Sequence, residues 1–376
     1  MQYRKFGKTN EDVSVLGFGA MRLPTLGDDN KIDIEKATKM MRTAIDNGLT
    51  YIDTAYSYHG GMSESFVAGV LKDGYREKVT IATKIPSWHI KTRKDMDKYL
   101  DEQLANLGVD CIDFLLLHTL TKDYWDIYKG NDVESFVETA KKEGKIKHIG
   151  FSFHDEIDVF KRIVDEFDWD FCMVQYNFMD TNYQAGEEGI TYAYDKGLGI
   201  AIMEPLRGGA LVNNIPDDVQ EKWDSLGGAH SVAGWALKYI WDDPRVSIIL
   251  SGMSDMNQVN DNIKEANSAQ VNNLTENEKS VINEIKQIYH SRILVNCTAC
   301  NYCMPCPFGV DIPKNFMFLN NSSMYQDIPG TKRVYTNFFE DESKSDKCTQ
   351  CGACEPLCPQ NIEIIDQLKQ VNETLG

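Results

Sequence analysis

The chain has 376 residues, and its 57 acidic and 39 basic side chains give a formal net charge of −18. This charge disfavours nucleic-acid backbones and anionic membrane surfaces as partners, because both would be repelled. No apolar stretch approaches the roughly 20 residues that cross a bilayer, and the opening MQYRKFGKTN lacks the apolar segment of a signal peptide. The length suits one barrel-sized domain plus an appendage, and we expect a cytoplasmic, reducing location.

The N-terminal third presents a series of apolar runs that end in polar groups. Residues 2–18 read as a polar hairpin that leads into a core strand, LGFGAM, and a helical pattern over 33–47 follows. The next run, GLTYIDTAYSY, ends with Asp53 and Tyr58. VTIATK then closes on Lys84, and CIDFLLLH closes on His118.

The same alternation of strand and helix patterns continues to about residue 290. A helix is expected over 63–72, another begins at the Thr92 and Asp95 capping box, and amphipathic stretches cover 157–167 and 232–240. Four more apolar runs lie between them: IKHIGFS, FCMVQYN, GIAIME and VSIILSG. Buried strands that alternate strictly with helices pair in parallel. The sequence therefore predicts an α/β fold, a (β/α)₈ barrel, rather than an open doubly wound sheet, whose G-x-G-x-x-G turn is missing.

Polar groups at the ends of three consecutive strands predict an active site. The C-terminal ends of barrel strands lie on one face, where barrel active sites form, so Asp53, Tyr58, Lys84 and His118 should meet there. A phenol has a pKa of about 10 and donates a proton near neutral pH only when a neighbouring cation stabilises its anion. Taken singly, each residue has a simpler structural explanation, such as a turn aspartate or a packed tyrosine.

Residues 1–290 resemble the aldo-keto reductase family, on the strength of IDTAYSY at Asp53 and Tyr58, TK at Lys84 and LLLH at His118. The resemblance implies hydride transfer between a nicotinamide and a carbonyl carbon, with Tyr58 protonating the carbonyl oxygen. It also implies that Lys84, oriented by Asp53, lowers the pKa of Tyr58, and that His118 positions the carbonyl.

The resemblance also implies a set of dinucleotide contacts. Ser152 and Gln175 match positions that hold the nicotinamide amide, and Asn177 shares a strand face with Gln175. The loops EPLRGG and SGMSDMNQVNDN match family turns near the phosphates and the adenosine, and supply Pro205, Leu206, Arg207, Gly209, Ser251, Gly252, Gln258 and Asn262.

Three departures from the family pattern bear on the choice of cofactor. Phe153 follows the serine where asparagine is usual, Met203 stands where an aromatic residue usually stacks on the nicotinamide, and no lysine or arginine occurs between Val246 and Asn262. We expect a weakened preference for NADPH and use of NADH as the alternative. Two readings of Arg207 stay open: it compensates for the missing basic residues, or it is a solvated loop charge.

The C-terminal part predicts iron–sulfur chemistry. Eight of the ten cysteines form two runs, Cys297, Cys300, Cys303 and Cys306, then Cys348, Cys351, Cys354 and Cys358, each followed by proline. The second run has the spacing of a bacterial [4Fe–4S] ligand set, and the first is one residue shorter. Zinc is the alternative, although it favours separated C-x-x-C pairs. Cys111 and Cys172 lie in apolar runs and read as core residues.

These runs resemble two-cluster ferredoxins. The resemblance implies two [4Fe–4S] clusters in which Cys358 joins Cys297, Cys300 and Cys303, while Cys306 joins Cys348, Cys351 and Cys354. We therefore expect a barrel domain over 1–290, closed by a helix that starts at the Thr275 and Glu278 capping box, and a helix-rich ferredoxin-like domain over 291–376.

The sequence thus predicts an NAD(P)H-linked oxidoreductase for a small carbonyl or alcohol, with an electron-transfer protein as a second candidate partner. Two alternatives remain open. One is an iron–sulfur electron-transfer protein that uses flavin or another acceptor, for which no flavin motif is recognisable. The other is a nicotinamide-binding redox sensor with little turnover.

Overall fold

The computed structural model describes residues 1–27, 31–297 and 299–376. The chain divides into two compact units, residues 1–208 with 230–274 and residues 209–229 with 275–376. α11 (Glu276–His290), expected to close the barrel domain, falls in the second unit. The domain boundary at residue 290 stays a prediction. None of the helices in the described ranges combines the length and apolar character that a membrane crossing requires.

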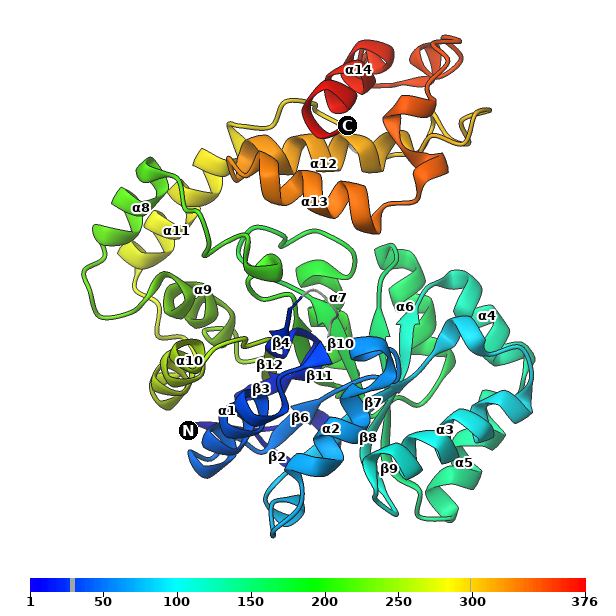
Figure 1. Cartoon of the computed structure of the whole chain (residues 1–376), viewed down its shortest axis with the longest axis vertical. Coiled ribbons are helices and arrows are strands. Elements are labelled where there is room, and N and C mark those ends of the chain that lie inside the picture. The colour runs from blue at the N-terminus through cyan, green and yellow to red at the C-terminus, as the bar shows by residue number, and fades with distance from the viewer. Residues whose placement is uncertain (28–30, 298) are drawn as a thin grey trace. The chain divides into compact units, whose positions relative to one another are not determined.

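The first unit is a closed barrel of parallel strands, which confirms the predicted fold class. Its strands in barrel order are β3 (Leu16–Gly19), β6 (Tyr51–Asp53), β7 (Thr80–Ile85), β8 (Ile112–Leu120), β9 (Ile146–Phe153), β10 (Phe171–Gln175), β11 (Gly199–Met203) and β12 (Ile248–Ser251). β12 pairs with β3 through Leu250 and Gly17, which closes the barrel. The strands gather at the centre of the unit with helices outside them (Figure 1).

The helices of this unit connect successive barrel strands, except the last helix, which follows β12. They are α1 (Ile34–Asp46), α2 (Ser63–Val70), α3 (Arg93–Leu107), α4 (Lys122–Gly130), α5 (Val133–Lys142), α6 (Ile157–Glu166), α7 (Gly186–Asp195), α9 (Val232–Trp241) and α10 (Met256–Ser268). The expected capping box forms at the start of α3, where the side chains of Thr92 and Asp95 bond the backbone. The expected hairpin is β1 (Tyr3–Lys5) with β2 (Asp12–Ser14), and a second one joins β4 (Thr25–Leu26) to β5 (Lys31–Ile32).

Side chains inside and outside the barrel form two separate cores. Phe6, which precedes the first barrel strand, packs inside against the rings of Tyr51, Phe114 and Phe171. The outward-facing residues meet the helices, and Cys172 is among them. Because side chains alternate along a strand, the inward positions of β6, β7, β9 and β10 also carry the polar groups at the C-terminal rim.

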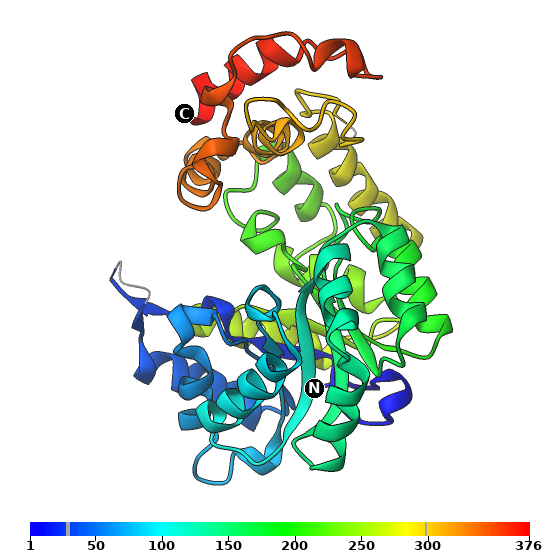
Figure 2. The same cartoon turned by 90° about the vertical axis from the view of Figure 1, so that its right-hand side faces the viewer.

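The second unit consists of helices and cysteine-bearing loops. α8 (Asp217–Asp224) packs on α11, while α12 (Ile312–Met324), α13 (Ile328–Phe338) and α14 (Ile364–Leu375) pack on one another (Figure 2). The apolar core includes Ile312, Phe316, Leu368 and Val371, and six of the cysteines pack against it. The expectation of a helix-rich domain holds here.

Candidate functional site

The structure brings Asp53, Tyr58 and Lys84 into direct contact at the C-terminal rim of the barrel. Lys84 Nζ lies 2.7 Å from Asp53 Oδ1 and 3.3 Å from the Tyr58 hydroxyl. It donates a third bond, of 2.8 Å, to the Thr54 carbonyl. Lys84 is 1% exposed and Asp53 is 4% exposed. The three donors of the ammonium group therefore have partners, which fixes its place beside the phenol.

His118 lies across the same rim from Tyr58. The two ring centroids are 6.1 Å apart and the rings are nearly perpendicular. Trp88, in a short helical turn after β7, has its ring centroid 5.1 Å from that of His118. His118 Nδ1 is buried and has no hydrogen-bond partner among the described residues. The sequence analysis did not identify Trp88; its signal was its position just after a strand that carries Lys84.

Burial and charge set the protonation of these groups. Burial lowers the pKa of Lys84, but Asp53 and Tyr58 outweigh it and hold that pKa above its usual value, so Lys84 is a cation. Burial, and next the charge of Lys84, lower the pKa of His118 well below its usual value, so the ring is neutral.

The pKa of Tyr58 moves in the direction opposite to the expected one. Burial raises it, and the charge of Lys84 opposes that rise without overcoming it. The reason is that moving a phenolate out of water costs more than one neighbouring cation returns. Tyr58 therefore holds its proton at neutral pH, and Lys84 lies where its positive charge would stabilise a phenolate anion.

Ser152 and Gln175 occupy inward positions on neighbouring strands. Ser152 pairs in register with Met173, two residues before Gln175, whose own partner is Met203. A bulge in β8 places Thr119 at a positive φ of 55°, and its N–H donates to Ser152 Oγ over 2.7 Å. The expected nicotinamide contacts thus lie together at the rim.

The side chain of Asn177, just beyond β10, forms hydrogen bonds within its own loop. Its Oδ1 accepts from the N–H groups of Met179 and Asp180, and its Nδ2 donates to Asp180 Oδ2 and the Glu204 carbonyl. These bonds use both donors and both lone pairs of the amide. Asn177 therefore braces the loop after β10, and its expected contact with a cofactor stays a prediction.

The loops after β11 and β12 carry the remaining expected contacts. Pro205 is buried, and Arg207 Nε lies 3.4 Å from Asp180 Oδ2. Gly209 begins a segment of the second unit. Ser251 accepts a 2.7 Å bond from Asn262, and Gln258 accepts one of 2.8 Å from the N–H of Ser254, so these residues brace the loop that contains Gly252.

Arg22 is a further residue of this region that the sequence analysis missed. It is exposed and follows β3. A Cβ atom at Gly208 would lie 2.9 Å from its Nη2, and one at Gly252 would lie 3.3 Å from its Cδ. The arginine therefore extends past both of the last two barrel loops, where barrel enzymes frequently bind phosphate.

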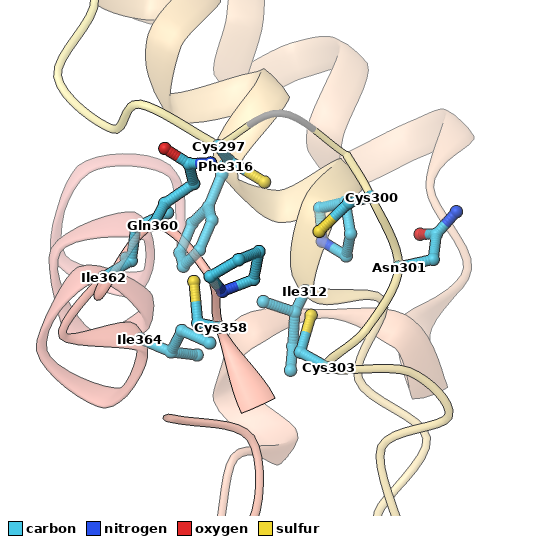
Figure 3. Close-up of a pocket in the computed structure, with 12 residues that line it drawn as sticks. Cys297, Cys300, Asn301, Cys303, Ile312, Phe316, Cys358, Gln360, Ile362 and Ile364 are labelled. Carbon is cyan, nitrogen blue, oxygen red and sulfur yellow. The ribbon is translucent and has the colours of Figure 1, made fainter. Parts of the chain in front are cut away.

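The cysteines line two hollows in the second unit, and each run contributes to both. A hollow of about 320 Å³, with its open part included, is lined by Cys297, Cys300, Cys303 and Cys358, whose sulfur atoms point toward one another (Figure 3). A second hollow, of about 700 Å³ with its open part included, is lined by Cys303, Cys306, Cys348, Cys351 and Cys354. The fourth cysteine of each run thus faces the cysteines of the other run.

The donor set fits iron–sulfur clusters. Thiolates are the usual ligands of such clusters, and Ile312, Phe316 and Ile364 give the first hollow an apolar wall. Burial raises the pKa of Cys303 to about 11, so a thiolate there needs nearby positive charge.

Comparisons with known proteins agree with both parts of the chain. Residues 15–287 match the aldo/keto reductase family, and residues 296–363 match a 4Fe-4S dicluster domain. An uncharacterized oxidoreductase of Bacillus subtilis is 26% identical over 318 residues, which cover 76% of this chain and 97% of that protein. L-galactose dehydrogenase of Arabidopsis thaliana is 25% identical over 282 residues, 70% of this chain and 87% of that protein.

Solved structures show the same barrel. An aldo-keto reductase from Bacillus halodurans, in its holo form, superposes with a TM-score of 0.65 at 27% identity, covering 76% of this chain and 96% of that one. A Klebsiella pneumoniae aldo-keto reductase in complex with NADPH gives 0.62 at 21% identity, over 76% and 95%. The second likeness supports the fold alone.

Proposed function

Since the chain belongs to the aldo/keto reductase family, we propose that its barrel reduces a small aldehyde or ketone, with Tyr58 as the proton donor. The observation that carries this proposal is the contact of a protonated, buried phenol with a lysine cation that Asp53 holds in place. A bound nicotinamide would supply the hydride. Ser152 and Gln175 would hold its amide, and Arg22 lies where its phosphates would bind.

The protein residues then divide the remaining chemistry. Tyr58 donates its proton to the carbonyl oxygen, and Lys84 stabilises the phenolate that remains. The neutral ring of His118 positions the carbonyl, while Trp88 and His118 wall off one side of the site from water. In the reverse direction the same phenolate would accept a proton from an alcohol.

We further propose that the two cysteine-lined hollows each hold one [4Fe–4S] cluster, with Cys358 and Cys306 exchanged between the runs. The lining of the hollows supports this crossed arrangement. A cluster moves single electrons, so an electron-transfer protein is the partner that this unit would serve.

The proposed reaction is tested with the full chain, purified anaerobically so that its clusters are retained. Oxidation of NADPH and NADH is followed at 340 nm with glyceraldehyde, benzaldehyde and cyclohexanone. Tyr58→Phe should lower the rate by about 10²- to 10⁴-fold while dinucleotide binding stays within a few-fold of the native protein. Full activity in Tyr58→Phe would contradict the assignment of Tyr58 as the proton donor.

A further inference from the structure

Asp180 lies at the centre of the expected nicotinamide site, and no function is yet attached to it. It sits in the loop after β10, five residues beyond Gln175. Its Oδ2 accepts from Gln175 Nε2 and from Asn177 Nδ2, each over 3.1 Å. Arg207 Nε lies 3.4 Å from the same oxygen, and the Asp180 side chain is 13% exposed. One carboxylate oxygen thus joins Gln175 to the side chains of Asn177 and Arg207 in the adjoining loops.

The loop around Asp180 is built to hold this carboxylate still. The Asn177 side chain accepts the N–H of Asp180 over 2.9 Å and that of Met179 over 3.0 Å, which closes a tight turn. Asn177 also ties the turn to the Glu204 carbonyl at the end of β11. Asp180 therefore cannot shift without breaking contacts on two neighbouring strands.

A carboxylate at this place decides which way the Gln175 amide faces. An ionised carboxylate accepts hydrogen bonds but donates none, whereas an amide can turn either its nitrogen or its oxygen toward a neighbour. Facing Asp180, Gln175 must present its NH₂ group, and its Oε1 is left to accept a bond from a ligand. The guanidinium of Arg207 offsets the charge of the carboxylate.

Ser152 is set in the complementary sense. Its Oγ accepts the N–H of Thr119 with one of its two lone pairs, and its hydroxyl proton can be donated to a ligand. One donor at Ser152 and one acceptor at Gln175 match the C=O and NH₂ groups of a primary carboxamide. If the Gln175 amide were turned the other way, Ser152 and Gln175 would both present donors to the carboxamide. The NH₂ group of the nicotinamide would then have no acceptor.

We propose that Asp180 is a positioning residue that fixes the Gln175 amide so that the site reads the carboxamide of a nicotinamide. This inference rests on the proposed function, because it assumes that Ser152 and Gln175 face the nicotinamide. It assigns Asp180 an effect on the nicotinamide end of the dinucleotide and none on the phosphates or the adenosine.

The test compares the binding of each dinucleotide with the binding of the corresponding molecule that lacks the nicotinamide. Dissociation constants of the full chain are measured by titration calorimetry for NADH and ADP-ribose, and for NADPH and 2′-phospho-ADP-ribose. Asp180→Asn should weaken dinucleotide binding about fivefold, the loss of roughly one neutral hydrogen bond, and leave ADP-ribose binding within twofold. Asp155→Asn, a carboxylate beyond the end of β9 that accepts backbone N–H groups, is the matched control and should change neither.

A double-mutant cycle shows whether Asp180 acts through Gln175. In a Gln175→Met background, Asp180→Asn should have no further effect on NADH binding, because the amide that it orients is gone. Binding of ADP-ribose reports that each variant is folded, and Asp180→Glu, which displaces the acceptor by one methylene, replaces Asp180→Asn if that variant fails to fold. Either Asp180 variant should weaken the binding of NADH more than the binding of ADP-ribose.

Three results would overturn the inference. The first is an Asp180 variant that weakens the binding of NADH and of ADP-ribose equally, and the second is one that changes the binding of neither. The third is an additive effect of the Asp180 and Gln175 substitutions on NADH binding. A native chain that binds neither NADH nor NADPH would overturn the proposed function itself, and the role of Asp180 with it.

Discussion

Tyr58 and His118 both lie at the barrel rim, but burial raises the pKa of Tyr58 and lowers the pKa of His118. Burial keeps the phenol protonated because the charged form is its deprotonated one, and it keeps the imidazole neutral because the charged form is its protonated one. Tyr58 therefore keeps, over the whole neutral range, the proton that the proposed reduction requires. His118 can position a carbonyl oxygen but has no extra proton to give.

The pH dependence of reduction follows from these two directions. The rate should stay level from pH 6 to 9, since His118 does not gain a proton there and Tyr58 does not lose one. It should fall only when the pH passes the raised pKa of Tyr58, above the usual value of about 10. Steady-state kcat/KM for carbonyl reduction, measured across this range, checks the prediction. A limb with a midpoint near pH 6.5 that disappears in His118→Gln would show that His118 titrates.

The buried pair of Asp53 and Lys84 makes a stability prediction. Lys84→Met leaves the Asp53 carboxylate, 4% exposed, without its cation. Removing one partner of a buried pair costs about 3 to 5 kcal/mol, so the free energy of unfolding should fall by that amount. Chemical denaturation followed by the fluorescence of the buried Trp125, Trp169 and Trp241 reports on the barrel.

The control for this prediction is the double variant Asp53→Asn with Lys84→Met. It removes the uncompensated charge and should regain much of the lost stability while remaining inactive. If the double variant is as unstable as Lys84→Met alone, the loss comes from packing, and the pair does not hold the lysine in the way described.

Barrel closure brings together elements that are far apart in the sequence. Because β12 pairs with β3, the turn after the first strand lies beside the loop after the last one. Arg22 thereby reaches Gly252 and, beyond it, Gly208. This arrangement places a cation, Arg22, beside the loop after β12. That loop has no positive charge of its own, because no lysine or arginine occurs between Val246 and Asn262.

Arg22→Gln should therefore weaken dinucleotide binding about tenfold or more, the value of a hydrogen bond to a charged group. Arg22→Gln should weaken the binding of ADP-ribose as much as the binding of NADH, whereas Asp180→Asn should weaken only the binding of NADH. Arg22→Gln should also reduce the salt dependence of the binding of both ligands. Arg22→Lys keeps the charge and should retain most of the affinity. Unchanged ADP-ribose binding in Arg22→Gln would exclude a phosphate contact.

The elements and the residues at their ends were predictable, whereas the contacts between loops were not. Eight apolar runs and their spacing gave the barrel, and the position of Lys84 at the end of one run placed it near Asp53. Asp180 and Arg22 follow no periodic pattern, because their neighbours depend on the paths of irregular loops. The hydrogen bonds of Asn177 within its own turn were likewise not predictable, because a shared strand face does not reveal them.

At the scale of the whole molecule, the crossed cysteine sets make the two runs interdependent. If Cys358 belongs with Cys297, Cys300 and Cys303, then Cys358→Ser should perturb the same cluster as Cys300→Ser. Cys306→Ser should likewise resemble Cys351→Ser. Electron paramagnetic resonance of the dithionite-reduced protein distinguishes the two patterns. A Cys358→Ser spectrum that matches Cys351→Ser would show that each run binds its own cluster.

The two units also pose the question of which electrons reach the substrate. In the proposed barrel reaction, a hydride from the nucleotide and a proton from Tyr58 reach the same carbonyl group without help from the clusters. If the clusters supplied the electrons instead, they would supply them singly, and the hydrogen on the product carbon would come from water. Label transfer separates these routes in the intact, cluster-containing chain, because a hydride carries its own hydrogen to carbon.

The most direct measurement uses NADH or NADPH deuterated at both C4 positions, with the most rapidly reduced of the tested carbonyl compounds, under anaerobic conditions. We predict that mass spectrometry will find one deuterium at the former carbonyl carbon, and that Tyr58→Phe will form the same labelled product about 10²- to 10⁴-fold more slowly. A product without deuterium at that carbon would contradict hydride transfer in the barrel.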